Sequence, residues 1–174
     1  YGPKIDVQVR SAIGHDVTLS TIQLDYQLPE RFELEYINEE GEKVRPVVIH
    51  RAILGSLDRF IAFLLEETKG VLPLWLAPVQ VNNEYHLEYA KEIRDLLVRN
   101  HIRVNLDDRN EKLGYKLREA VMKKTLYNVV LGDKEINNKE ISYRMYGSSE
   151  TTTVSQSDFV KLITDEIASR TLNK

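Results

Sequence analysis

The chain has 174 residues, of which 42% are apolar and 29% charged, and its formal net charge is −3. This composition predicts an ordinary globular protein with one large or two small domains. No apolar run approaches the roughly eighteen residues of a membrane span, and the charge gives no overall attraction to nucleic acid. Without cysteine there is no disulfide or thiolate metal site, which together with the missing apolar leader fits a cytoplasmic protein. A start at Tyr1 rather than methionine predicts a fragment or a processed product.

The first part of the chain predicts strands joined by turns. Alternating apolar and polar residues indicate two antiparallel hairpins, residues 4–9 with 17–26 and residues 32–37 with 44–50. Gln23 is a polar residue inside the second of these strands. Periodicity alone favours the interpretation that its side chain is bonded to neighbouring backbone.

Residues 44–60 (VRPVVIHRAILGSLDRF) are the most informative stretch of the chain. An apolar strand ends at His50, turns at Gly55, and enters a helix over residues 56–67 that carries Arg59. A lone histidine at the end of a buried strand is most often a hydrogen-bonded core residue, and a zinc ligand would need at least two further strong ligands. Arg59 is either a phosphate clamp or, more commonly, an exposed helical arginine.

Residues 73–78 (PLWLAP) form an apolar junction bracketed by two prolines, and the pattern then changes. Strands are expected at residues 79–81, 102–106, 127–131 and 141–145, and helices at residues 84–100, 111–124 and 157–172. This alternation predicts a small α/β domain with helices packed on a sheet. Ser157 is the expected N-cap of the last helix.

A polar cluster, residues 107–118 (DDRNEKLGYKLR), follows a strand and opens a helix, where open α/β sheets bind their ligands. Asn110 has a donor and an acceptor for a base edge, and Tyr115 can stack on a base. Three cations at helical spacing form a basic strip: Lys112, Lys116 and Arg118. The alternative is a solvated, ion-paired helix, because acidic residues of the same stretch can neutralise the strip. Residues 132–135 (GDKE) are expected at the same sheet edge.

Six segments, in this order, carry a resemblance to a known family: YGPKID, STIQLDYQLPERFELEYI, RPVVIHRAILGSLDRF, PLWLAPVQV, DDRNEKLGYKLREA and VVLGDKE. Together they resemble the C-terminal part of bacterial threonyl-tRNA synthetases, which are class II aminoacyl-tRNA synthetases. The resemblance implies a fold of mixed α/β and α+β class. Residues 1–74 would be the end of the antiparallel-sheet catalytic domain, with motif 3, and residues 75–174 a small α/β anticodon-binding domain.

The resemblance implies threonine–tRNA ligase activity, in which threonine and ATP form threonyl-adenylate and threonine passes to tRNA(Thr). It further implies a cytoplasmic homodimer that uses Zn²⁺, and Mg²⁺ with ATP. Motifs 1 and 2 and two zinc ligands lie outside these 174 residues, so the chain is expected to be inactive alone. The alternatives are an RNA-binding module or regulatory paralogue that recognises the anticodon without catalysis, and a prolyl or histidyl synthetase, against which HRAILGS argues.

The resemblance also implies roles for single residues. His50 matches one of three ligands of the zinc that holds the amino and hydroxyl groups of threonine. Arg59, which matches the ATP-contacting arginine of motif 3, and Lys4 are the implied catalytic residues. The implied substrate and ATP contacts are Tyr1, Lys4, Gln23, Gly55, Ser56 and Arg59. The implied anticodon contacts are Asn110, Arg118, Glu135 and Arg144.

One departure from the family concerns the stretch VQVNNEYHLEYA, which is a few residues shorter after Val81 than in the family. A strand of three residues is short for the centre of a sheet, where about five or six are usual. We expect that residues were omitted from the sequence here, because deletion of a central strand would expose the core of the domain.

Overall fold

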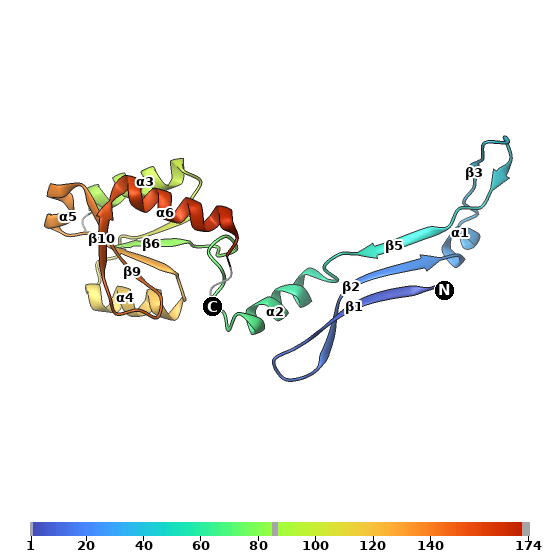
Figure 1. Cartoon of the computed structure of the whole chain (residues 1–174), viewed down its shortest axis with the longest axis horizontal. Helices are drawn as coiled ribbons and strands as arrows, with labels where there is room; N and C mark the ends of the chain where they lie inside the picture. Colours follow the sequence, from blue (N-terminus) through green and yellow to red (C-terminus); the bar gives the residue numbers. More distant parts are fainter. Residues whose placement is uncertain (1, 85–86, 172–174) are drawn as a thin grey trace. The chain divides into compact units, whose positions relative to one another are not determined.

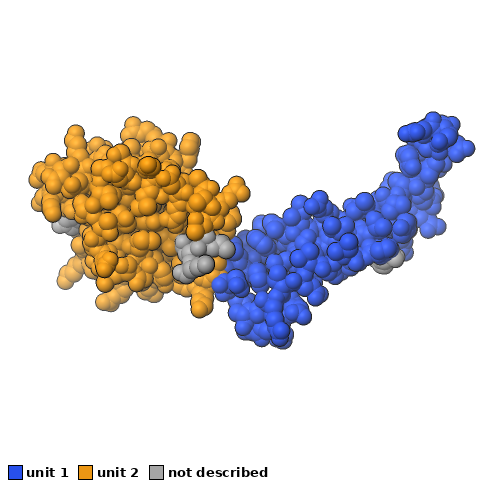
Figure 2. Space-filling model, in the orientation of Figure 1, with its two compact units in different colours: residues 1–67 blue, residues 68–174 orange. Residues whose placement is uncertain are grey.

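The computed structural model describes residues 2–84 and 87–171. The chain divides into two compact units, residues 1–67 and residues 68–174 (Figure 2). The domain boundary expected from the sequence lies between residues 74 and 75, whereas the segment 68–74 clusters with the second unit. Leu74 is fully buried there and belongs to the core of that unit.

The first unit is built on a three-stranded antiparallel sheet in the order β1-β2-β5 (Figure 1). Its elements are β1 (Lys4–Arg10), β2 (Asp16–Asp25), α1 (Gln27–Arg31), β3 (Tyr36–Ile37), β4 (Lys43–Val44), β5 (Val48–Ala52) and α2 (Leu57–Glu67). The predicted pairing of the first two strands is confirmed. The second predicted hairpin is wrong in extent: only the two-residue strands β3 and β4 pair, and β5 pairs with β2 instead.

The sequence patterns did not predict the helix α1, which contains Pro29. Proline is tolerated in the first turn of a helix, where its missing N–H costs no hydrogen bond. Oδ1 of Asp25 accepts the backbone N–H groups of Gln27 and Leu28 at 2.8 and 3.1 Å. The carboxylate therefore takes up donors that the start of the helix leaves unpaired.

The sheet of the first unit has a polar face and a mainly apolar face, because side chains alternate along each strand. The polar face carries Lys4, Asp6, Thr21, Gln23, Asp25 and His50. The apolar side chains of the opposite face are exposed: Ile5, Val7, Ile22 and Ile49. The expectation of a buried strand ending at His50 is therefore wrong, since residues 49–52 are all exposed.

The second unit is a five-stranded sheet in the order β10-β9-β8-β6-β7, with β6, β7 and β8 parallel and β9 and β10 antiparallel. Its elements are β6 (Val81–Glu84), α3 (Leu87–Arg99), β7 (Val104–Asp107), α4 (Leu113–Met122), β8 (Tyr127–Val130), α5 (Asp133–Asn138), β9 (Glu140–Met145), β10 (Thr152–Ser155) and α6 (Gln156–Ser169). The predicted α/β domain is confirmed, and α5 and β10 are additional.

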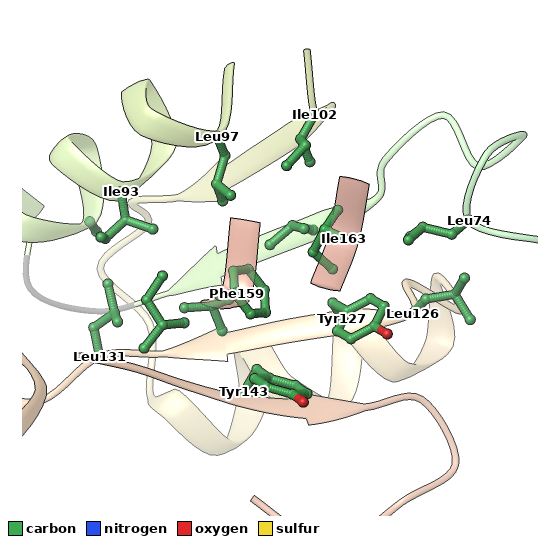
Figure 3. Packing of buried hydrophobic residues seen from close by; sticks show 14 of the residues in the cluster. Leu74, Ile93, Leu97, Ile102, Leu126, Tyr127, Leu131, Tyr143, Phe159 and Ile163 are labelled. Carbon is green, nitrogen blue, oxygen red and sulfur yellow. The ribbon is translucent and has the colours of Figure 1, made fainter. Parts of the chain in front are cut away.

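One apolar core holds the second unit together (Figure 3). Ile93 and Leu97 of α3 and Phe159 and Ile163 of α6 are fully buried against one face of the sheet. The ring centroid of Phe159 lies 5.2 Å from that of Tyr143. Burying one such side chain contributes roughly 1.5–3 kcal/mol, so this cluster accounts for the fold of the unit.

Two boundaries differ from the predicted ones for physical reasons. The central strand occupies residues 81–84 rather than 79–81, since pairing with β7 and β8 runs from Val81 to Glu84, while the side chain of Gln80 donates to the Leu74 carbonyl and accepts from the Arg103 N–H, each at 2.8 Å. The N-cap of α6 is Ser155 rather than Ser157, and its Oγ accepts the Asp158 N–H at 3.1 Å. Across residues 2–84 and 87–171, no helix is both long and apolar enough to cross a membrane.

Candidate functional site

The polar face of the first unit aligns three of the predicted site residues in one row across the sheet. Gln23 of β2 is the register partner of Lys4 in β1 and of His50 in β5. Opposed residues of antiparallel strands have Cβ atoms about 4.5–5.5 Å apart, so the three side chains can contact one small ligand. Tyr1, a further predicted contact, lies outside the described residues.

Asp25 holds the imidazole of His50. Nε2 of His50 lies 2.8 Å from Oδ2 of Asp25, and the side chains are 47% and 3% exposed. The bond from His50, followed by the backbone N–H of Leu28, keeps the pKa of Asp25 below its ordinary value. Asp25 therefore stays ionised and accepts a hydrogen bond from Nε2 of His50, so Nδ1 is the ring nitrogen that Asp25 does not engage. A carboxylate that orients an imidazole in this way is the usual support of a metal-binding histidine.

The residues that the structure describes contain no cluster of three histidine, cysteine, aspartate or glutamate side chains able to hold a metal ion. His50, which Asp25 orients, therefore belongs to no such cluster among the described residues.

Lys4, at one end of this row, is a cation held by an ion pair. Its Nζ lies 2.9 Å from Oδ2 of Asp6, and the Thr21 hydroxyl donates to Asp6 at 2.7 Å. The bonds from Lys4 and Thr21 lower the pKa of Asp6. The ammonium group is half exposed and can neutralise a carboxylate or phosphate placed on the polar face.

The turn between β5 and α2 carries Gly55, Ser56 and Arg59. Gly55 has φ +61°, and a Cβ atom there would lie 3.2 Å from the Leu19 carbonyl oxygen, so both conformation and space favour glycine. Leu19 is four residues from Gln23 along β2, or about 13 Å. The turn is therefore displaced along the sheet from the row of Lys4, Gln23 and His50. Arg59 is exposed on α2.

In the second unit, two of the acidic residues near α4 are paired with one arginine. Arg109 donates to Asp107 at 2.8 and 2.6 Å and also to Glu119. Hydrogen bonding to Arg109 lowers the pKa of both carboxyls. Lys116 is only 6% exposed and donates to the Asp107 carbonyl at 2.7 Å. The predicted basic strip is therefore wrong at Lys116, whose side chain is buried. Asp107 is ion-paired, as the alternative interpretation expected.

The side chains of the four expected anticodon contacts differ in their exposure and in their hydrogen bonds within the chain. Asn110 and Arg118 are exposed, before and on α4. Glu135 is engaged: its carboxylate accepts the Ser142 hydroxyl and the Gly132 N–H, each at 2.8 Å, and the Ser142 bond lowers its pKa. Arg144 is half-buried on β9, and its Nη2 lies 3.3 Å from the Thr151 hydroxyl.

Sequence reasoning missed a polar row across the second sheet. Asn105, Asn82, Asn128 and Arg144 are successive register partners on β7, β6, β8 and β9. Nδ2 of Asn105 donates to Oδ1 of Asn82 at 2.7 Å. The only signal in the sequence is an asparagine at an otherwise apolar strand position, as in YNVV at residues 127–130.

The polar row ends at a cavity of about 360 Å³. Its lining consists of Leu117 and Val121 from α4, Asn128 from β8, Arg144 and Met145 from β9, and the turn at residues 147–149. Oδ1 of Asn128 and Nε of Arg144 are buried, and neither atom has a hydrogen-bond partner among the described residues. Asn128 and Arg144 thus line the cavity, but these two polar atoms are themselves shielded from solvent.

Comparisons with known proteins match both units. Residues 74–166 match the family described as "Anticodon binding domain", and residues 1–68 match "tRNA synthetase class II core domain (G, H, P, S and T)". "Threonine--tRNA ligase" of Staphylococcus aureus (strain bovine RF122 / ET3-1) is 53% identical over 172 residues, and that of Staphylococcus carnosus (strain TM300) is 54% identical over 172 residues. Each match covers 96% of this chain and 27% of the relative.

A solved structure agrees with these matches. The RNA binding domain of Threonyl-tRNA synthetase from Cryptosporidium parvum Iowa II has a TM-score of 0.80 and 35% identity, covering 95% of this chain and 43% of that chain. The chain therefore spans about a quarter of the length of the curated relatives it matches.

Proposed function

We propose that the chain recognises tRNA(Thr) and forms part of the catalytic centre of a threonine–tRNA ligase. It belongs to the anticodon-binding domain family through residues 74–166, and it is similar to threonine–tRNA ligases along 96% of its length. The whole enzyme would join threonine to tRNA at the expense of ATP. Residues 1–74 would contribute to the catalytic domain and residues 75–174 to recognition of the anticodon.

The observation that carries RNA recognition is the charge state around α4. Asp107 and Glu119 would repel phosphate if they were free, but Arg109 pairs with both of them. Arg118 and Asn110 remain exposed nearby for phosphate or base contacts. Arg109 thus offsets part of the charge of these two carboxylates, while Asp108 and Glu111 of the same stretch stay exposed, so binding would depend on the placement of Arg118 and Asn110.

For catalysis, we assign the polar face of the first unit to the threonine and adenylate moieties. Lys4 and Gln23 would contact the adenylate or its threonyl group, Gly55 and Ser56 would lie beside the nucleotide, and Arg59 would stabilise phosphate charge in the transition state. Tyr1 is included on the resemblance alone. Mg²⁺ would accompany ATP. Such a reaction depends on positioning and electrostatics rather than on a covalent nucleophile.

For zinc, we assign His50 as one ligand. The fit rests on Asp25, which binds Nε2 and leaves Nδ1 as the donor. The remaining ligands that tetrahedral zinc requires would come from the rest of the enzyme. When bound, zinc would hold the amino and hydroxyl groups of threonine and so reject valine, which lacks the hydroxyl. We also assign the enzyme to the cytoplasm, as a homodimer, by its likeness to the family.

RNA recognition is tested by the affinity of the 174-residue chain for the anticodon hairpin of tRNA(Thr). Arg118→Ala and Asn110→Ala are each expected to weaken binding about tenfold, as loss of one base or phosphate contact does. Lys161→Ala, which removes an exposed cation of α6, serves as the matched control and should change little. Equal binding to unrelated hairpins would contradict the proposal.

The catalytic part is tested in the full-length protein by threonine-dependent ATP–pyrophosphate exchange. Arg59→Ala should reduce exchange at least a hundredfold while hairpin affinity stays unchanged, since removing one transition-state donor costs about that much. A regulatory RNA-binding paralogue is the alternative. It predicts hairpin binding with no exchange even in the unmodified protein.

A further inference from the structure

One guanidinium group joins three consecutive segments of the second unit. Arg109 lies in the turn at residues 108–112, between β7 and α4. It donates to both carboxylate oxygens of Asp107, the last residue of β7, at 2.8 and 2.6 Å, and to the carboxylate of Glu119 in α4. A forked pair between arginine and carboxylate fixes direction as well as distance, so these bonds hold the turn against the helix.

The strand end to which Arg109 is bound is itself fixed. The side chain of Asp107 is buried, and the buried ammonium group of Lys116 donates to the Asp107 carbonyl at 2.7 Å. The backbone N–H of Arg109 also donates to Oδ1 of Asp107 at 3.3 Å, and the N–H of Glu111 donates to the Arg109 carbonyl at 2.8 Å. Arg109 therefore connects the turn to a well-anchored point of the sheet.

Asn110, the next residue of the turn, has no such support of its own. Its side chain is exposed, and the side chains of residues 108 and 110–112 form no hydrogen bond or ion pair with another described residue. The N-cap residue of α4, Lys112, contributes no side-chain bond to the start of the helix. Within the described part of the chain, Arg109 is therefore the residue whose side chain ties this turn to the rest of the unit.

We propose that Arg109 is a positioning residue for tRNA recognition: by joining Asp107 to Glu119, it holds Asn110 in the place from which Asn110 contacts the RNA. A turn that is ordered before binding loses no further conformational freedom when the RNA binds, which strengthens binding without a new contact. This role differs from that of the exposed Arg118, whose charge meets the RNA directly. The inference rests on the proposed function and adds a residue that acts through Asn110.

The test compares the affinity of the unmodified 174-residue chain and of Glu119→Ala for the anticodon hairpin of tRNA(Thr). This substitution removes a negative charge and one partner of Arg109, so electrostatics alone would strengthen binding to the RNA. Loss of positioning instead weakens binding, by roughly two- to tenfold, because the turn must then be ordered on binding. The matched control is Glu111→Ala, which removes an exposed carboxylate of the turn outside the Arg109 ion pairs and should leave affinity unchanged or slightly higher.

A second variant and a second background show whether the effect passes through Asn110. Arg109→Lys keeps the charge but not the fork, and should weaken binding as Glu119→Ala does. In the Asn110→Ala background, both substitutions should cause little further loss. Unweakened binding by folded Glu119→Ala or Arg109→Lys, or an undiminished loss in the Asn110→Ala background, would overturn the inference. Failure of the unmodified chain to prefer the threonine hairpin would instead overturn the proposed function, so the two failures are distinguishable.

Discussion

The two units of this chain differ in whether their apolar side chains are buried or exposed. All the apolar side chains that form the buried core belong to residues 68–174. In the described part of residues 1–67, the buried positions are Ser11, Asp25 and Pro29, while isoleucines and valines of the sheet are exposed. The second unit therefore has an apolar core of its own, whereas the first unit presents a polar face on a sheet whose apolar side is exposed.

The part of the chain that supplies stability therefore differs from the part that carries the proposed catalytic residues. The row of Lys4, Gln23 and His50 depends on strand pairing rather than on a core of its own. Three strands with one uncovered apolar face are marginal in water without a packing partner. We therefore expect the geometry of the first unit to depend on further protein that covers its apolar face, and the second unit to keep its structure alone.

The largest effect is expected from Phe159→Ala. Phe159 is fully buried between Tyr127 and Tyr143, and truncating such a residue costs about 3–5 kcal/mol of unfolding free energy. Denaturation followed by the fluorescence of Trp75, the single tryptophan, reports on this unit. A loss below about 1 kcal/mol would show that the core is not the source of its stability.

The next effect concerns the first unit in the full-length protein. Asp25→Asn should weaken zinc binding about 10–100-fold, because the carboxylate that orients His50 is lost. Competition with a chelator measures this affinity independently of activity. Asp16→Asn, which changes an exposed carboxylate of the same strand, is the control. Unchanged zinc affinity in Asp25→Asn would remove His50 from the proposed metal site.

Acid should destabilise the second unit through Asp107 and Glu119. Arg109 lowers the pKa of both carboxyls in the folded state below their unfolded values of about 3.9 and 4.3. Their stabilisation is therefore present above about pH 4 and is lost as pH falls through the lowered folded pKa values. Thermal unfolding of the unmodified chain between pH 6 and pH 3 is compared with that of Arg109→Gln. The variant should show a shallower loss, and equal slopes would contradict this origin.

The smallest effect is expected from Ile49→Ala, the counterpart of Phe159→Ala. Ile49 is 62% exposed on the apolar face of the first sheet, so its loss should change the unfolding free energy by less than about 0.5 kcal/mol. Amide hydrogen exchange in β2 and β5 of the 174-residue chain measures this change. A large loss of protection would mean that the apolar face is covered in solution.

Sequence patterns predicted the elements that are long and periodic. The β1–β2 pair and the α/β alternation of the second unit followed from spacing alone. Short elements such as α5 and β10 carry too few residues for a period to show. The burial of Lys116 was missed because helical spacing does not reveal that the backbone carbonyl of Asp107 accepts a hydrogen bond from its ammonium group.

The two rows of polar residues across the sheets could not be predicted from the sequence, for a different reason. Lys4, Gln23 and His50 meet only because three strands pair in one register, and Asn128 meets Arg144 in the same way. The resemblance pointed to Lys4, Gln23, His50 and Arg144 individually but not to Asn128. Cross-strand neighbours come from separate segments, so a single sequence does not specify them.

The asparagines of β6 also affect the register in which the central strand pairs with its neighbours. With Val81 as its only apolar core residue, this strand of four residues has almost no hydrophobic pattern to distinguish correct pairing from a slipped one. The Asn82–Asn105 bond and the bond from Asn83 to the Ala90 carbonyl supply that information. A slip of one residue would break both. The two amides thus help to set the register of this strand. Replacing them by valine should give a more apolar strand whose register is less well defined.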